Sequence, residues 1–257
     1  MPIPIKSPLL PALAAATLLT ATASAAITVS NTSSGLFSTN ASGNFSITYD
    51  VINSGSVVVV GFYTDAGNSA VSSVGFGTGV SNQLSNQLLS QARSALAYFS
   101  NPSTDSGLSF SGIAGANVAN AGYFIWELSG VDLLAVAATA IGTSNATQIT
   151  TTAVNSFITS IVGINPFGAV TFGPDTTNSI LTEIAEVDAN SGIGGGWLGA
   201  GQAVAATAGV QELGWDVTGA GFGDLREMAF AFTPVVPEPS SLLLLLGGAG
   251  LMFKRRR

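Results

Sequence analysis

Alternating and continuous runs of apolar residues divide most of the chain into predicted β-strands. Residues 44–52, NFSITYDVI, place apolar side chains on one face and polar side chains on the other, which is typical of a half-buried strand. Residues 56–65, SVVVVGFYTD, form a continuous apolar run, which is typical of a strand buried on both faces. Further strand patterns are SSVGFG (72–77), Ala95–Phe99, GLSFSG (107–112), GYFIWELSG (122–130), ITTTAVNSFITSIVGI (149–164), GAVTFG (168–173), LTEIAEV (181–187) and REMAFAFTPV (226–235).

Two segments do not follow this pattern. Leu84, Leu88 and Ala92 recur at helical spacing, so residues 82–93 are predicted to form a short helix. Residues 131–142, VDLLAVAATAIG, fit a strand or a helix equally well. Residues 191–201, SGIGGGWLGAG, are predicted to form a glycine-rich loop, and no repeat of fixed period is visible. The spacing of the strands predicts an all-β fold, with one β-sandwich or jelly-roll-like domain over residues 26–235.

The two ends of the chain differ from this body. Residues 1–25 contain an early cation, Lys6, then an apolar centre around residues 13–19, and end on small residues in TATASA. These are the parts of a secretory signal peptide, so we expect recognition by the Sec export machinery and cleavage between Ala25 and Ala26.

The C-terminal residues 236–257, VPEPSSLLLLLGGAGLMFKRRR, combine two prolines, an uncharged apolar run and a basic end. Residues 240–253 would span roughly 21 Å as a helix, a short transmembrane segment. The four cations Lys254, Arg255, Arg256 and Arg257 would then stay on the cytoplasmic side of the inner membrane.

Composition excludes several kinds of function. The chain has no histidine and no cysteine, so His- or Cys-based metal sites and Ser-His-Asp or Cys-His catalysis are excluded. All but one of its 14 acidic residues lie in the body, where the only cations are Arg93 and Arg226. Nucleic-acid binding, which needs clustered Lys and Arg, is therefore not expected.

Functions that depend on side-chain oxygens, namely calcium binding and catalysis by carboxylates, remain possible. Glu186, Asp188 and Asn190 imitate the start of a calcium loop, although the closing ligand of an EF-hand would fall on Gly199, so a polar turn is the simpler interpretation. No other cofactor is expected. A carboxylate-dependent glycoside hydrolase would need two acidic groups at a suitable separation, and spacing alone does not choose among the candidates Glu127, Asp132, Glu183, Glu212, Asp216 and Glu227.

Carbohydrate binding is a further alternative, in which an exposed tryptophan would stack on a sugar. Of the three tryptophans, Trp126 is expected in the core, and Trp197, set among glycines, is expected to be exposed. The favoured hypothesis is a non-catalytic exported protein of the cell surface or the exopolysaccharide matrix.

Two resemblances support this hypothesis. The first resemblance is to a secreted bacterial β-sandwich module, and it rests on five segments in this order: VVVVGFYTD, SSVGFG, AYFSNP, WELSGVD and ITTTAVNSF. This resemblance implies a jelly-roll-like fold and no particular activity.

The tail resembles the PEP-CTERM sorting signal of Gram-negative bacteria, also named the ice-binding protein C-terminal domain, with Pro237, Glu238 and Pro239 as its motif. This resemblance implies an exosortase-type membrane protease as partner, a precursor anchored in the inner membrane, and a final place at the cell surface or in the exopolysaccharide.

Overall fold

The computed structural model describes residues 25–64, 71, 73–77, 79–80, 83–88, 93–100, 102, 104, 109–113, 118, 121–142, 147–166, 170–175, 177, 179–188, 196–219 and 222–236. These residues form β-strands, turns and loops, with no helix among them, so the all-β prediction is confirmed. The residues from Ser24 to Val235 make one compact unit.

The first half of the body contributes nine strands, which pair antiparallel: β1 (Thr28–Phe37), β2 (Asn44–Thr48), β3 (Val57–Thr64), β4 (Ser73–Phe76), β5 (Gly79–Val80), β6 (Gln83–Leu88), β7 (Arg93–Ser100), β8 (Ser109–Ile113) and β9 (Ala121–Ser129). The second half contributes nine more, also antiparallel: β10 (Ala138–Gly142), β11 (Thr147–Thr151), β12 (Ser156–Pro166), β13 (Val170–Pro174), β14 (Thr182–Asp188), β15 (Trp197–Ala205), β16 (Gly209–Leu213), β17 (Trp215–Gly219) and β18 (Phe222–Phe232).

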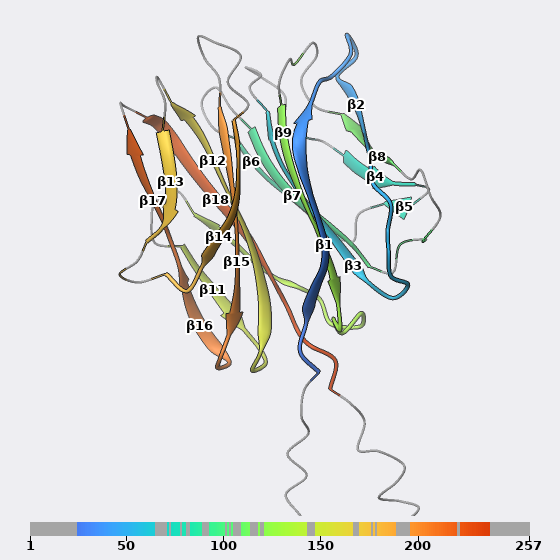
Figure 1. The fold of residues 1–257 in the computed structure, drawn as a ribbon, viewed down its shortest axis with the longest axis vertical. Helices are drawn as coiled ribbons and strands as arrows, with labels where there is room; N and C mark the ends of the chain where they lie inside the picture. Colours follow the sequence, from blue (N-terminus) through green and yellow to red (C-terminus); the bar gives the residue numbers. More distant parts are fainter. Residues whose placement is uncertain are drawn as a thin grey trace, which may run out of the picture. The chain divides into compact units, whose positions relative to one another are not determined.

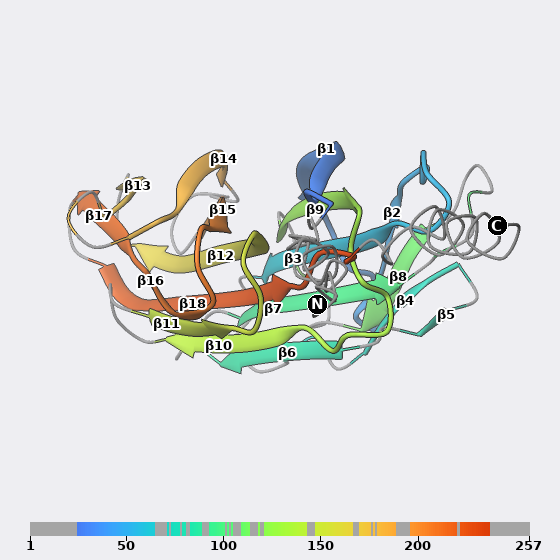
Figure 2. The same cartoon turned by 90° about the horizontal axis from the view of Figure 1, so that it is seen from below.

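Two five-stranded sheets form the centre of the body (Figure 1). The first central sheet has the order β1-β9-β3-β7-β6, and the second has the order β10-β18-β12-β15-β14. Their facing sides share one cluster of buried side chains, in which Tyr98 of the first sheet makes edge-on ring contacts with Phe230 and Phe232 of the second at 5.2 and 5.4 Å between centroids. Figure 2 shows the two sheets from below.

Each central sheet is also covered on its other side. The order β2-β8-β4-β5 forms the first outer sheet, whose aromatic side chains pack on the first central sheet through a second apolar cluster. The pairs β11-β16 and β13-β17 cover the second central sheet through a third cluster. The body therefore has more β layers than the two of the expected sandwich, and central strands such as β3 are buried on both faces because both faces meet another layer.

The two halves repeat the same arrangement of strands. In each, the first strand pairs with the last and the last with the third, as β1-β9-β3 and β10-β18-β12. The turns before β3 and β12 also correspond, because Gly55 and Asn155 both have positive φ values, 72° and 59°. No repeat is visible in the sequence because the same backbone path is filled by different side chains in the two halves.

The predicted helix over residues 82–93 is wrong, since residues 83–88 form β6 and pair with β7. An interval of four residues also fits the two-residue period of a strand, and Ser and Asn, which occur twice each over residues 81–86, are weak helix formers. The first five residues of the predicted glycine-rich loop, 191–195, lie outside the described residues. Its end, from Trp197, belongs to strand β15.

Candidate functional site

The first and last residues of the folded body lie side by side, so the chain enters and leaves the body at the same place. The backbone N–H of Ala25 donates to the carbonyl of Val235 at 3.1 Å, and the N–H of Val235 donates to the carbonyl of Gly130 at 2.9 Å. Val131 forms a β-bridge with Pro234. The predicted signal-peptide cleavage site, between Ala25 and Ala26, therefore lies beside the start of the C-terminal tail (Figure 1).

The predicted sorting residues Pro237, Glu238 and Pro239 and the basic end, Lys254 to Arg257, lie outside the described residues, as does the predicted membrane segment at residues 240–253. The described residues contain no helix that is long and apolar enough to cross a membrane.

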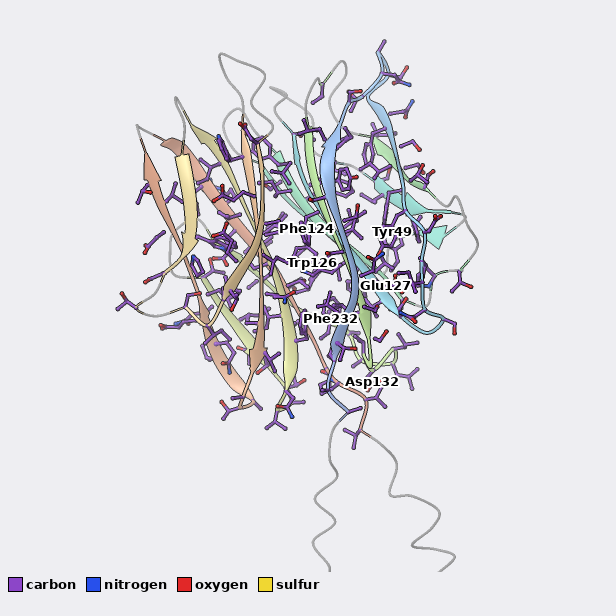
Figure 3. All side chains as sticks on the ribbon, viewed as in Figure 1. Tyr49, Phe124, Trp126, Glu127, Asp132 and Phe232 are labelled. Carbon is purple, nitrogen blue, oxygen red and sulfur yellow. The ribbon has the colours of Figure 1, made fainter. Side chains whose placement is uncertain are left out.

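Glu127, on β9, is fully buried between the first central and first outer sheets, and its carboxylate holds a neighbouring loop in place. It accepts hydrogen bonds from the backbone N–H groups of Ile52 and Asn53 at 3.0 and 2.7 Å and from the hydroxyl of Tyr49 at 3.2 Å (Figure 3). Burial, and then the Glu127 charge, raise the pKa of Tyr49 well above its ordinary value. These contacts assign Glu127 a structural role at the turn that leads into β3.

Glu227, on β18, is also fully buried, but it lies on the side of the second central sheet that faces away from the first. One carboxylate oxygen accepts a hydrogen bond from the Ser160 hydroxyl at 2.8 Å, and this hydroxyl also accepts one from the indole N–H of Trp215 at 3.3 Å. The second oxygen has no hydrogen-bond partner among the described residues. Burial raises the pKa of Glu227 to about 7, although the hydrogen bonds oppose this shift.

The two buried glutamates cannot act as a catalytic pair, because they belong to different layers of the body and neither is accessible to solvent. Asp132 accepts a hydrogen bond from the N–H of Leu134 at 3.0 Å and closes a turn. Glu212 and Asp216 are exposed on β16 and β17, where Glu212 accepts a hydrogen bond from the amide of Gln148.

Glu183 and Glu186 lie close together on β14. Partial burial, and then the charge of Glu186, raise the pKa of Glu183 to about 6. Of the predicted calcium ligands, Glu186 and Asp188 are exposed on β14, and Asn190 lies outside the described residues. Three or more acidic side chains close enough to hold a metal ion do not occur together in the part of the chain that the structure describes.

The tryptophans do not form the expected sugar-binding platform. Trp126 is buried between the central sheets, as predicted (Figure 3). Trp215 is buried in the second half. Trp197 is only half-exposed and packs against the apolar cluster of the second half, so the prediction of an exposed ring at this position is wrong. Trp197 is the first residue of β15, where it pairs with Ile164 of β12 and Asp188 of β14 and is therefore part of the sheet.

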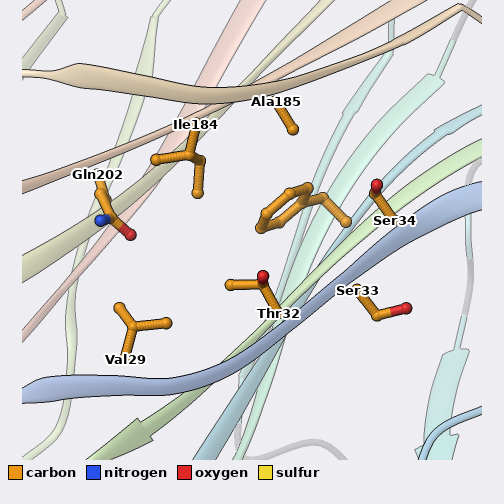
Figure 4. A pocket seen from close by; sticks show the side chains of 8 residues that line it. Val29, Thr32, Ser33, Ser34, Ile184, Ala185 and Gln202 are labelled. Carbon is orange, nitrogen blue, oxygen red and sulfur yellow. The ribbon is translucent and has the colours of Figure 1, made fainter.

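A groove of about 340 Å³ lies between β1 and β14, the edge strands of the two central sheets (Figure 4). Its lining combines hydroxyl and amide groups with apolar side chains: Val29, Thr32, Ser33, Ser34, Phe124, Ile184, Ala185 and Gln202. The side-chain oxygen of Gln202 is buried and has no hydrogen-bond partner among the described residues. The groove can therefore offer hydrogen bonds to a small polar ligand, and none of the described residues that line it is charged.

Sequence reasoning missed this groove because it did not predict β1. Residues 28–37, TVSNTSSGLF, are rich in Ser, Thr and Asn, which suit a turn as well as an edge strand. The alternation of half-buried and exposed positions along β1 appears only in the structure, because the residue types of this segment do not alternate between polar and apolar.

The chain matches no curated protein and no solved structure. Its tail, however, matches a known sorting motif, which is found on exported cell-surface proteins. Residues 235–257 match the model of the PEP-CTERM protein-sorting motif, so the chain carries this motif at its C-terminus, and exosortase is its processing enzyme.

Proposed function

We propose that this chain is a non-catalytic structural protein of the cell surface or the exopolysaccharide matrix of a Gram-negative bacterium. The observation that carries the proposal is the sorting motif at residues 235–257, placed directly after the last residue of a folded all-β body. The tail anchors the precursor in the inner membrane, exosortase cuts near Pro237–Pro239, and the body remains outside the cell.

The body supports this role through its construction. The first half has the two sheets of a jelly roll, β1-β9-β3-β7 and β2-β8-β4-β5. The second half repeats the first of these sheets as β10-β18-β12-β15, whereas its outer strands form the separate pairs β11-β16 and β13-β17. The buried carboxylates hold backbone and hydroxyl groups within the layers. An acidic, disulfide-free β body of this kind suits a durable matrix component that needs no redox environment to fold.

The test uses the full-length precursor with Pro237 and Pro239 replaced by Ala. Membrane insertion should be unchanged, since both residues precede the apolar run, but processing should stop because the extended motif is lost. Immunoblots of cell fractions, with an antibody raised against the body, should show the full-length variant accumulating in the membrane fraction while the parent is shortened and released.

The matched control replaces Pro234 by Ala, a proline that lies in the body next to the motif. This variant should be processed like the parent. If the Pro237→Ala, Pro239→Ala double variant is also shortened and released like the parent, the tail acts only as an anchor and the proposal is wrong.

A further inference from the structure

Exposed apolar side chains gather where the chain enters and leaves the body. Leu134 and Val136, in the loop before β10, are 95% and 82% exposed. Leu133 in the same loop, and Val235 at the end of the body, are exposed as well. We call these four residues the terminal pole.

Backbone contacts hold the terminal pole together. The N–H of Asp132 donates to the carbonyl of Thr233 at 2.8 Å, and the adjacent Val131 and Pro234 form a β-bridge. The turn itself is closed by the hydrogen bond from the N–H of Leu134 to the Asp132 carboxylate. The apolar loop and the last residues of the body therefore form one ordered surface, close to the position of Asp132 in Figure 3.

The length of the tail limits how far this surface can lie from a membrane. Val235 is the last residue with a backbone hydrogen bond to the body, and the uncharged apolar run starts at Leu242. Seven residues span at most about 25 Å when fully extended, so an anchored tail keeps the terminal pole close to the lipid headgroups.

We propose that the terminal pole docks on the lipid surface while the precursor is anchored, with Leu133, Leu134 and Val136 entering the interface between headgroups and acyl chains. This rests on the proposed anchoring of the precursor by its tail. Insertion of apolar side chains to this depth lowers the free energy of the system. Single exposed leucines on a protein surface need no explanation, whereas a cluster of exposed apolar side chains beside a membrane tether indicates a contact surface. The terminal pole contains no basic residue, so the contact depends on apolar insertion and not on attraction to anionic lipids.

The chain has no cysteine, so single reporter cysteines can be introduced into the full-length precursor. The experiment places an environment-sensitive fluorophore on Leu134→Cys, with the precursor reconstituted in vesicles of phosphatidylethanolamine and phosphatidylglycerol. The matched control is Leu36→Cys, which also replaces an exposed leucine and is 53% exposed. Leu36 lies eleven residues after Ala25, and most of these residues belong to β1. Eleven residues of extended strand cover roughly 35 Å between Ala25 and Leu36.

A lipid-borne quencher should reduce emission from position 134 and leave position 36 unchanged, while aqueous iodide should show the opposite preference. Raising the salt concentration should not release the contact.

If iodide quenches both positions equally in precursor that resists carbonate extraction, anchoring holds and the docking proposal is wrong. If position 134 is shielded from both quenchers, a protein covers the terminal pole and the lipid assignment is wrong. If the precursor is not in the membrane at all, the proposed function fails and the docking proposal fails with it.

Discussion

At the scale of single residues, the two buried glutamates show how surroundings decide the behaviour of one side-chain type. Glu127 accepts hydrogen bonds from two backbone N–H groups and a hydroxyl, so both of its carboxyl oxygens have partners within the core. Glu227 receives the Ser160 hydroxyl, and its second oxygen has no partner among the described residues. Burial of Glu227 therefore favours its neutral form, and its pKa rises to about 7.

This difference predicts a pH-dependent stability. Between the ordinary glutamate pKa of 4.5 and about 7, the folded protein binds a proton at Glu227 that the unfolded chain has lost. The free energy of unfolding should therefore fall as pH rises through this window and stay low above it. Glu227→Gln mimics the neutral acid, so it should be more stable than the parent at pH 8, by on the order of 2 kcal/mol, and about equal to it at pH 4.5.

Urea unfolding of both proteins between pH 4.5 and 8 provides the measurement. Glu212→Gln is the control, since this exposed carboxylate should leave the pH dependence of the parent unchanged. A parent and a Glu227→Gln variant that lose the same stability between pH 4.5 and 8 would contradict the assignment to Glu227.

At the scale of elements, glycines allow strands of the two central sheets to approach one another. A Cβ atom on Gly61 of β3 would lie 2.5 Å from a methyl carbon of Ile161 on β12. Gly201 of β15 has a similar role on the other face, where a Cβ atom would lie 2.8 Å from the Trp215 ring. These positions carry no side chain because the space belongs to a residue of a neighbouring layer.

Gly61→Ala should therefore destabilise the body by about 1 to 3 kcal/mol, the usual cost of adding a methyl group to a filled core. Gly173→Ala is the matched control, because a Cβ atom there has no neighbour within 4 Å. Thermal unfolding followed by far-ultraviolet circular dichroism should show a lower Tm for the first variant and not for the second. Equal Tm values for Gly61→Ala and the parent would show that Ile161 moves aside without cost.

At the scale of the whole body, the apolar cluster between the central sheets joins the two halves. Each half contributes large side chains to it, among them Trp126 from the first and Phe230 from the second. Separating the halves would expose this surface to water, so neither half is complete without the other.

The two halves should therefore unfold together. Trp126 reports on the first half and Trp215 on the second, since each is fully buried there. A Trp126→Phe variant keeps only the tryptophans of the second half, and a Trp197→Phe, Trp215→Phe variant keeps only that of the first half. For each variant, the midpoint of urea unfolding measured by fluorescence should coincide with the midpoint measured by circular dichroism. Midpoints that separate between the two probes would show that the halves unfold independently.

The sequence by itself determined the class of the fold and the sorting of the chain. Strands such as β3 and β9 are visible as local patterns of apolar residues, because a strand buried on one or both faces must show that burial in its own residues. The sorting motif is readable in the same way, since the processing machinery recognises a linear segment.

Only the tertiary structure decided which strands pair, that the body has two halves with the same strand arrangement, and what each carboxylate does. The strands β1 and β15 carry polar or small residues, and they are strands because their neighbours supply hydrogen bonds and cover them. Glu127 looks like a catalytic candidate in the sequence, whereas its partners lie more than 70 residues away in the chain. The contacts that fix these features join residues far apart in sequence, and no local pattern records them.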